Sequence, residues 1–181
     1  MANLLTGIRL LLIFPLTWEF ARPGFMSPWL LLLLLGVAIA TDYFDGVVAR
    51  RTNTASAAGQ LFDHSTDFLL VTSGLAGLAW AGLITPILPP LIVIAFSQYV
   101  LDSHFLYRQK NLRMSYIGRW NGIFYFVPLC LIAFSRLELL SAVADLLETL
   151  ALIIAWLLVL TTIISIIDRA IAPLRHKTEK T

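Results

Sequence analysis

The sequence predicts an all-α integral membrane protein with six transmembrane helices and both termini in the cytoplasm. The first observation is composition: the 181 residues are 59% hydrophobic and 13% charged, with a mean hydropathy of +0.83. A soluble domain is about half apolar and about a quarter charged. The second is a series of six apolar stretches, each long enough or nearly so for the roughly 20 helical residues that a bilayer core requires. The third is the one-sided distribution of lysine and arginine.

The six expected spans are separated by short turns rich in proline, glycine and charge, and no strand alternation typical of a membrane barrel is visible in the sequence. Residues 1–181 are therefore expected to form one transmembrane domain, with 172–181 as a flexible cytoplasmic tail. The spans are Leu4–Phe20, Pro28–Val48, Gln60–Leu83, Pro86–Tyr107, Ser115–Ser135 and Leu147–Ala170.

Basic residues orient this topology, because cytoplasmic loops of membrane proteins carry an excess of lysine and arginine. Only Arg22 and Arg136 fall on the outer side, and Arg9 lies within the first span. The basic side would also face anionic lipid headgroups. The cytoplasmic set is Arg50, Arg51, Arg108, Lys110, Arg113, Arg119, Arg169, Arg175, Lys177 and Lys180.

Four aspartates at the cytoplasmic ends of the second and third spans are the main functional signal. Asp42 and Asp45 are three residues apart, and Asp63 and Asp67 are four apart, so each pair shares one helical face. Each aspartate near a helix centre costs about 2.5–3.5 kcal/mol on insertion scales. Antiparallel packing of the two spans would bring the four carboxylates to one volume, which then requires a counter-charge.

Hard carboxylate oxygens suit Mg²⁺, Mn²⁺ or Ca²⁺, and two such ions about 4 Å apart can assist phosphoryl displacement. The alternative is a structural ion-pair network with Arg9, Arg50 and Arg51, which we consider the weaker explanation for four acids at matched spacing. The histidines are isolated along the chain, so no zinc site is expected. They are His64, His104 and His176.

The spacing of these residues resembles the signature of the CDP-alcohol phosphatidyltransferases. The segment from Asp42 to Asp67 reads D-x2-D-G-x2-A-R-x8-G-x3-D-x3-D, so all eight signature positions are matched. The opening Asn3-Leu-Leu-Thr6-Gly-Ile-Arg9 is similar to the N-x2-T-x2-R of many members. With the six expected spans, the resemblance covers most of the chain.

The resemblance implies a phospholipid-synthesising enzyme that moves a phosphatidyl group from CDP-diacylglycerol to a polar alcohol and releases CMP. By analogy, two Mg²⁺ or Mn²⁺ ions are held by the aspartates, and Asp67 is the general base. A carboxylate beside metals is a weak base, so we expect late proton transfer or a metal-acidified hydroxyl. Single displacement and a covalent intermediate are both compatible with these residues. The metal ligands would be Asp42, Asp45, Asp63 and Asp67, and the CDP-lipid site Asn3, Thr6, Arg9, Gly46, Ala49, Arg50 and Gly59.

The acceptor is less well specified. Phosphatidylglycerophosphate synthases often carry D-P-x-x-D and G-K-x-K-T, whereas this chain has His64 after Asp63 and reads Gly118-Arg119-Trp120-Asn121-Gly122. Glycerol 3-phosphate, inositol and inositol phosphate therefore all remain candidates. Acceptor-binding residues are sought in the loop after the fourth span and at the start of the fifth, namely Arg113, Arg119, Asp102 and His104.

A divalent-cation transporter is the alternative from another class, because intramembrane carboxylates also line ion pathways. Transporters often contain internal repeats and broken helices at matching positions, and neither is visible in this sequence. A catalytically inactive homologue is disfavoured by the intact acidic set. We expect the lipid bilayer and a second copy of the chain, as a homodimer, to be its partners, and no nucleic acid. The expected location is the bacterial inner membrane.

Overall fold

Every regular element that the structure describes is helical, as the sequence predicts. The computed structural model describes the backbone of residues 2–51, 57–101 and 116–178, and the side chains of residues 6–42, 59, 61–101 and 117–171. The elements are α1 (Ala2–Ala21), α2 (Pro28–Arg51), α3 (Ala57–Trp80), α4 (Leu88–Leu101), α5 (Tyr116–Phe124), α6 (Phe126–Ser135), the 3₁₀ helix η2 (Glu138–Val143) and α7 (Ala144–Thr178).

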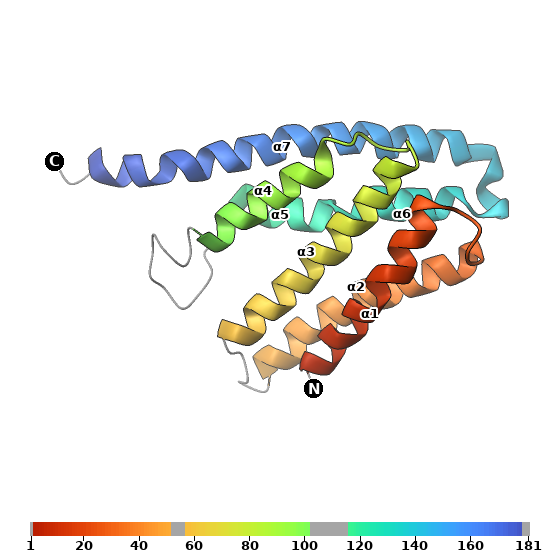
Figure 1. The fold of residues 1–181 in the computed structure, drawn as a ribbon, viewed down its shortest axis with the longest axis horizontal. Coiled ribbons are helices and arrows are strands. Elements are labelled where there is room, and N and C mark those ends of the chain that lie inside the picture. Colours follow the sequence, from red (N-terminus) through yellow and green to blue (C-terminus); the bar gives the residue numbers. More distant parts are fainter. Residues whose placement is uncertain (1, 52–56, 102–115, 179–181) are drawn as a thin grey trace.

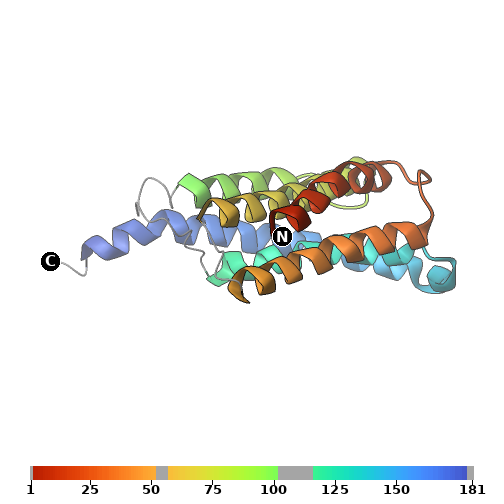
Figure 2. The same cartoon turned by 90° about the horizontal axis from the view of Figure 1, so that it is seen from below.

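The helices lie as an elongated bundle in which α7 extends along its full length (Figure 1). The start of α1, the end of α2 and the start of α3 meet at one end, and the α1–α2 and α6–α7 connections lie at the other (Figures 1 and 2). The most extensive packing is between α1 and α3, followed by α6 with α7 and α1 with α2. The motif-bearing ends of α2 and α3 are thus brought together beside α1.

Within the described residues, the helix positions agree with five of the six expected spans. The exception is the fifth span, which contains a break. The stretch expected at Ser115–Ser135 is divided at Tyr125 into α5 and α6. Pro128 follows this break and has no N–H to donate to the carbonyl one turn earlier, which is a common cause of a helix interruption. Asp102 and the rest of the fourth expected span beyond Leu101 lie outside the described residues.

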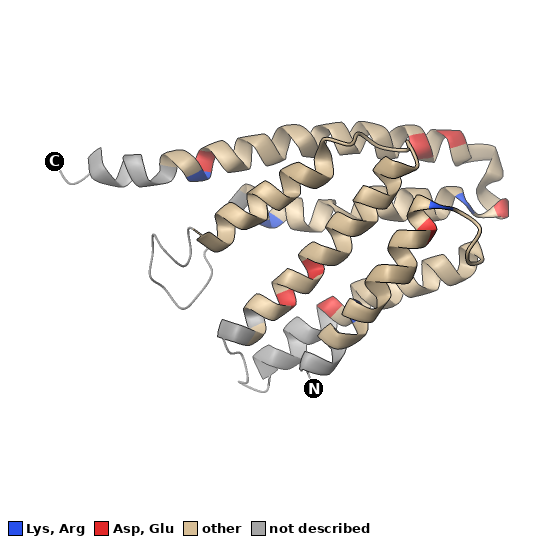
Figure 3. Cartoon of the chain, viewed as in Figure 1, with Lys and Arg blue, Asp and Glu red and all other residues tan. Residues whose placement is uncertain are grey.

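Two segments of the described chain are long and apolar enough to cross a membrane by length and composition. They are Ile117–Ser135 and Glu138–Ile171, and the shorter apolar helices Pro28–Asp42 and Leu88–Leu101 accompany them. The all-helical class is confirmed, whereas the six-span topology stays a prediction. In Figure 3 the charged positions of the described ribbon lie toward the two ends of the bundle, with an uncharged stretch between them.

Close approach of α1 and α3 depends on a glycine. A Cβ atom at Gly77 would lie 2.8 Å from the carbonyl oxygen of Thr17 and 3.1 Å from the Cβ of Phe20. Small residues of this kind allow the backbones of membrane helices to approach closely. Leu16 and Phe20 of α1 then join the buried core with Leu75 of α3.

A buried ion pair closes the opposite end of the bundle. Glu19, 3% exposed, accepts a hydrogen bond from Arg136 Nη1 at 3.1 Å and from the backbone N–H groups of Gly24 and Met26 at 3.2 and 3.0 Å. Arg136 Nη1 also donates to the Glu19 carbonyl at 2.9 Å. Burial lowers the pKa of Arg136, and the charges of Glu19 and Glu148 oppose that shift. This Glu19–Arg136 pair joins the α1–α2 turn to the end of α6.

We predict that Gly77→Ala lowers the thermal stability of the detergent-solubilised protein. The added methyl group would clash with backbone atoms of α1, so the two helices must separate at a cost of about 1–3 kcal/mol. Gly36→Ala in α2 is the matched control, because nothing lies within 4 Å of its added Cβ. Equal melting temperatures for the two variants would contradict the assigned role of Gly77.

We also predict that Arg136→Met destabilises the fold by about 3–5 kcal/mol, because it leaves the buried Glu19 carboxylate without its cation. Chemical unfolding in detergent measures the change. Arg22→Met is the control, since Arg22 is exposed at the same end and its guanidinium lies over the Trp18 ring at 5.3 Å. An Arg136 variant as stable as the Arg22 variant would show that the Glu19–Arg136 pair does not stabilise this end.

Candidate functional site

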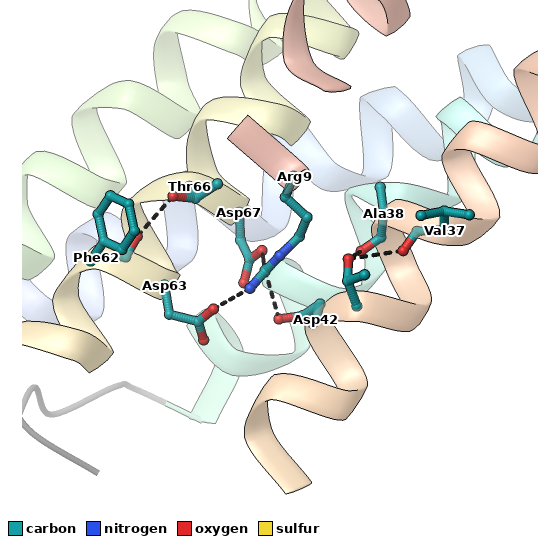
Figure 4. Close-up of polar contacts among 9 residues, drawn as sticks. Arg9, Val37, Ala38, Asp42, Phe62, Asp63, Thr66 and Asp67 are labelled. Carbon is teal, nitrogen blue, oxygen red and sulfur yellow. Dashed lines mark hydrogen bonds and ion pairs between the residues drawn. The ribbon is translucent and has the colours of Figure 1, made fainter. Parts of the chain in front are cut away.

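Three of the four aspartates converge on one arginine at the motif-bearing end of the bundle (Figure 4). Arg9 of α1 forms ion pairs with Asp42 of α2 and with Asp63 and Asp67 of α3. Arg9 Nη1 donates to Asp42 Oδ1 at 3.0 Å, and the same nitrogen also donates to Asp67. Asp63 and Asp67, four residues apart on α3, lie on one helical face as predicted. We refer to Arg9, Asp42, Asp63 and Asp67 together as the acidic cluster.

Exposure within the acidic cluster differs sharply between its members. The Arg9 side chain is 0% exposed, whereas Asp42, Asp63 and Asp67 are 41%, 25% and 21% exposed. With all groups ionised, three negative charges face one positive charge, so two negative charges are left without compensation inside the cluster. Partly accessible, negatively charged oxygens are what a hard divalent cation requires. The donor set therefore fits Mg²⁺ or Mn²⁺.

His64 is a member of this neighbourhood that the sequence interpretation did not include. One potential ligand atom each from Asp63, His64 and Asp67 lie within 4.8 Å of one another. His64 is isolated in the sequence from other histidines, but the turn of α3 places it beside the two acids. In the sequence, the position of His64 directly after the predicted ligand Asp63 could have indicated that His64 lies at the site. A mixed carboxylate and imidazole set also suits Mn²⁺.

The structure describes only some residues of the predicted CDP-lipid site. Thr6 is buried one turn before Arg9 on α1, and Gly59 lies near the start of α3. The alternative of a structural ion-pair network is realised at Arg9, while the other two arginines proposed for it are not described. The side chains of Asn3, Asp45, Gly46, Ala49, Arg50 and Arg51 lie outside the described residues, as do Asp102, His104 and Arg113 of the predicted acceptor site.

A pocket of about 630 Å³ adjoins the acidic cluster, and Asp42, His64 and Asp67 form part of its wall. Asp63 is not among the residues that line it. Of the described acids in the cluster, Asp42 and Asp67 thus face both Arg9 and the pocket.

The rest of the pocket wall combines cations with apolar side chains. Arg119 and Asn121 of α5 and Ser165 and Arg169 of α7 contribute polar groups. Arg119 thus lines the same pocket as Asp42 and Asp67, and its role in acceptor binding stays a prediction. The sequence interpretation grouped Arg169 only with the cytoplasmic charges, because its approach to α5 depends on how α7 packs. The apolar part of the wall includes Ile39, Val71, Ile92, Phe96, Ile123 and Phe126.

Contacts among aromatic side chains connect α3 to the pocket cation on α7. Phe68 and Phe96 stack with ring centroids 4.1 Å apart, and Phe96 contacts Tyr99 at 5.9 Å. The Arg169 guanidinium lies over the Tyr99 ring at 4.9 Å, within the range of a cation–π interaction. Gln98 donates to the Ile166 carbonyl at 3.2 Å and holds α4 against α7. Arg169 is therefore oriented by packing.

The α5–α6 break also contributes to this wall. The Tyr125 and Thr162 hydroxyl groups share a buried hydrogen bond of 2.6 Å, which joins the break to α7. Tyr125 N–H donates to the Asn121 carbonyl at 2.9 Å, so the chain keeps helical pairing at this point. Asn121, on the same turn, lines the pocket. The sequence predicted a continuous helix here, and the break that the structure shows instead helps to position Asn121 in the pocket wall.

Fold and site together define a helical, strongly apolar protein with a carboxylate cluster suited to divalent cations beside a pocket of mixed charge. The chain belongs to the CDP-alcohol phosphatidyltransferase family, which it matches over residues 1–167. This confirms the resemblance inferred from the eight-position signature. Members of this family are transferases of phospholipid synthesis, and membrane association follows from the family.

Two curated relatives illustrate the range within the family. The chain is 36% identical over 97 residues to a cardiolipin synthase (CMP-forming) of Streptomyces coelicolor, an alignment of 51% of this chain and 44% of that protein. It is 30% identical over 125 residues to a CDP-diacylglycerol–glycerol-3-phosphate 3-phosphatidyltransferase of Escherichia coli K12, covering 65% of this chain and 67% of the relative. The aligned part thus spans less than half of the Streptomyces protein.

Proposed function

We propose that this protein transfers a phosphatidyl group from CDP-diacylglycerol to a phosphate-bearing alcohol, releases CMP, and uses two Mg²⁺ or Mn²⁺ ions. The observation that supports this most strongly is the placement of Asp42 and Asp67 in one wall of a pocket that also presents Arg119 and Arg169. Carboxylates suit the cations that would bind the diphosphate of the donor, while arginines suit a second phosphate. Family membership favours this transferase over the divalent-cation transporter.

The proposed chemistry forms one P–O bond and breaks another. The acceptor hydroxyl oxygen attacks the phosphorus of the phosphatidyl phosphate, and the bond from that phosphorus to the oxygen of CMP breaks. Asp67 faces the pocket and accepts the hydroxyl proton. When bound, the two divalent ions stabilise the charge that develops on the departing CMP. Asp42, Asp45 and Asp63 hold those ions in this proposal, as the family signature implies.

Arg119 and Arg169 are proposed to bind the acceptor's phosphate and so direct its hydroxyl toward Asp67. An arginine fork pairs with two phosphate oxygens at once, which fixes orientation as well as affinity. The Tyr99 ring beneath Arg169 limits the positions open to the guanidinium. Glycerol 3-phosphate and inositol phosphate both supply a phosphate for this arrangement, and free inositol supplies none.

A phospholipid with a hydroxyl-bearing headgroup, such as phosphatidylglycerol, is a second candidate acceptor. The apolar side chains of Ile92, Ile123 and Phe126 in the same pocket favour it, because they can contact acyl chains, which glycerol 3-phosphate lacks. The similarity to a cardiolipin synthase (CMP-forming) points the same way. Comparing both acceptors in one CMP-release assay separates these candidates.

The site is proposed to face the cytoplasm of a bacterial inner membrane. Arg119 and Arg169 line the pocket that includes Asp42 and Asp67, whereas Arg22 follows the end of α1 and Arg136 pairs with Glu19 at the end of the bundle where α1 connects to α2 (Figure 1). This distribution supports the positive-inside orientation inferred from the sequence. A homodimer remains part of the proposal on family analogy alone.

We predict that Asp67→Asn lowers CMP release by about 100-fold or more, because the amide cannot accept the hydroxyl proton. The assay uses the reconstituted protein with CDP-diacylglycerol, Mg²⁺ or Mn²⁺ and an acceptor panel of glycerol 3-phosphate, inositol, inositol phosphate and phosphatidylglycerol.

Asp67→Asn should retain binding of CDP-diacylglycerol, whereas Asp63→Asn should weaken the cation-dependent binding of this donor. Asp145→Asn, an exposed acid at the other end, is the control. Near-normal turnover by Asp67→Asn would show that Asp67 is not the base, and no CMP with any acceptor would refute the transferase.

Arg169→Gln is expected to raise KM for a phosphate-bearing acceptor by about tenfold or more, because a charge-assisted hydrogen bond to phosphate is lost. KM for CDP-diacylglycerol should change much less. Arg22→Gln, which removes an exposed arginine at the opposite end, should leave both values unchanged. An equal rise in both KM values for Arg169→Gln would assign the residue to the donor.

A further inference from the structure

Arg9 lies where the carboxylates of α2 and α3 converge, and this position is at odds with a simple role in holding the CDP-lipid. Its side chain is fully buried and pairs with all three described carboxylates of the acidic cluster. The proposed function assigns two of these carboxylates, Asp42 and Asp63, to divalent cations and makes the third, Asp67, the base. Two kinds of positive group are therefore directed to one set of ligands.

A guanidinium and a divalent cation seated among the same carboxylates repel each other. Mg²⁺ requires carboxylate oxygens at about 2.0–2.1 Å in near-octahedral geometry, so a bound ion would lie close to the Arg9 guanidinium that donates to the same carboxylates. A carboxylate has lone pairs for more than one partner, so the conflict is between the two positive charges, which repel strongly in a poorly hydrated site. Seating a cation on Asp42 and Asp63 thus favours withdrawal of Arg9 from these contacts.

We propose that Arg9 is an exchangeable internal counter-ion of the acidic cluster, which a divalent cation displaces from the carboxylates. This inference rests on the proposed function, because it takes the cluster to be the cation site. Three carboxylates close together repel one another, and a buried guanidinium on a third helix offsets that repulsion. Arg9 also keeps the ligand carboxylates of α2 and α3 directed toward one point.

The exchange gives Arg9 a second role. Once it leaves the carboxylates, its planar fork of N–H donors matches the oxygens of a diphosphate. The donor lipid carries such a diphosphate, and the cations that displace Arg9 bind beside it. Cation loading therefore prepares the residue that binds the donor, and the two ligands bind with positive cooperativity.

Binding of Mn²⁺ alone to the full-length protein in detergent tests this exchange. Electron paramagnetic resonance of free Mn²⁺ gives the dissociation constant for wild type, Arg9→Gln, Arg9→Lys and the control Arg22→Gln. Arg9→Gln removes the competing charge, so its Kd for Mn²⁺ should fall by about tenfold or more, which corresponds to about 1.4 kcal/mol. Arg9→Lys keeps a charge and should lie between Arg9→Gln and wild type.

Thermal unfolding supplies a readout that a purely structural role of Arg9 would not produce. Without Mn²⁺, Arg9→Gln should melt below wild type, because the carboxylates lose their counter-ion. With saturating Mn²⁺, its melting temperature should rise more than that of wild type, because tighter ligand binding gives greater stabilisation. A variant that stays equally destabilised with Mn²⁺ would overturn the proposal.

The remaining outcomes separate this proposal from the proposed function. Mn²⁺ binding to Arg9→Gln that equals or is weaker than wild type, while wild type still releases CMP, overturns the exchange and leaves the transferase intact. Absence of Mn²⁺ binding to both proteins overturns the exchange together with the assigned cation site. Arg9→Lys provides the same comparison if Arg9→Gln does not fold.

Discussion

Charge compensation within an apolar helical bundle is the constraint on which the site depends. Asp42, Asp63 and Asp67 approach one another on two helices because Arg9 enters between them from a third. Removing these charges from water is costly, and their mutual attraction offsets the cost only when hydrogen-bond geometry is favourable. The partial exposure of the carboxylates toward the pocket leaves room for additional positive charge, which is the property that the proposed chemistry uses.

The close contact between α1 and α3 makes that arrangement possible. Gly77 allows the α1 backbone to lie against α3 near Thr17, and the same two helices carry Arg9 and the pair Asp63 and Asp67 about two to four turns further along. The Glu19–Arg136 pair fixes α1 at its other end. A rigid helix held at both ends places one side chain accurately, so packing far from the pocket controls the geometry of the acidic cluster.

Hydropathy and spacing predicted the helical class and the approximate helix positions, because these follow from local periodicity. The convergence of Asp42, Asp63 and Asp67 was also predicted, because a short connection makes the second and third spans antiparallel neighbours. The family also follows from spacing, since the signature lies in one continuous segment. Arg169, His64 and the break at Tyr125 were not predicted as parts of the site. Their contribution depends on which helices become neighbours: Arg169 reaches the pocket because Gln98 and Tyr99 hold α4 against α7. Arg9 was assigned to the donor, and its pairing with the acids was considered the weaker explanation; the structure shows that this pairing is made.

The buried layer between the two charged ends has a consequence for ion gradients. A polar pocket within a bilayer is a potential leak for protons and small ions. Leu16, Phe20 and Leu75 fill the bundle between the acidic cluster and the Glu19–Arg136 pair, and each is at most 1% exposed. In a membrane-spanning orientation, this layer makes the pocket a one-ended cavity. In the proposed transferase, charged phosphate chemistry at the pocket would then leave an ion gradient across that membrane intact.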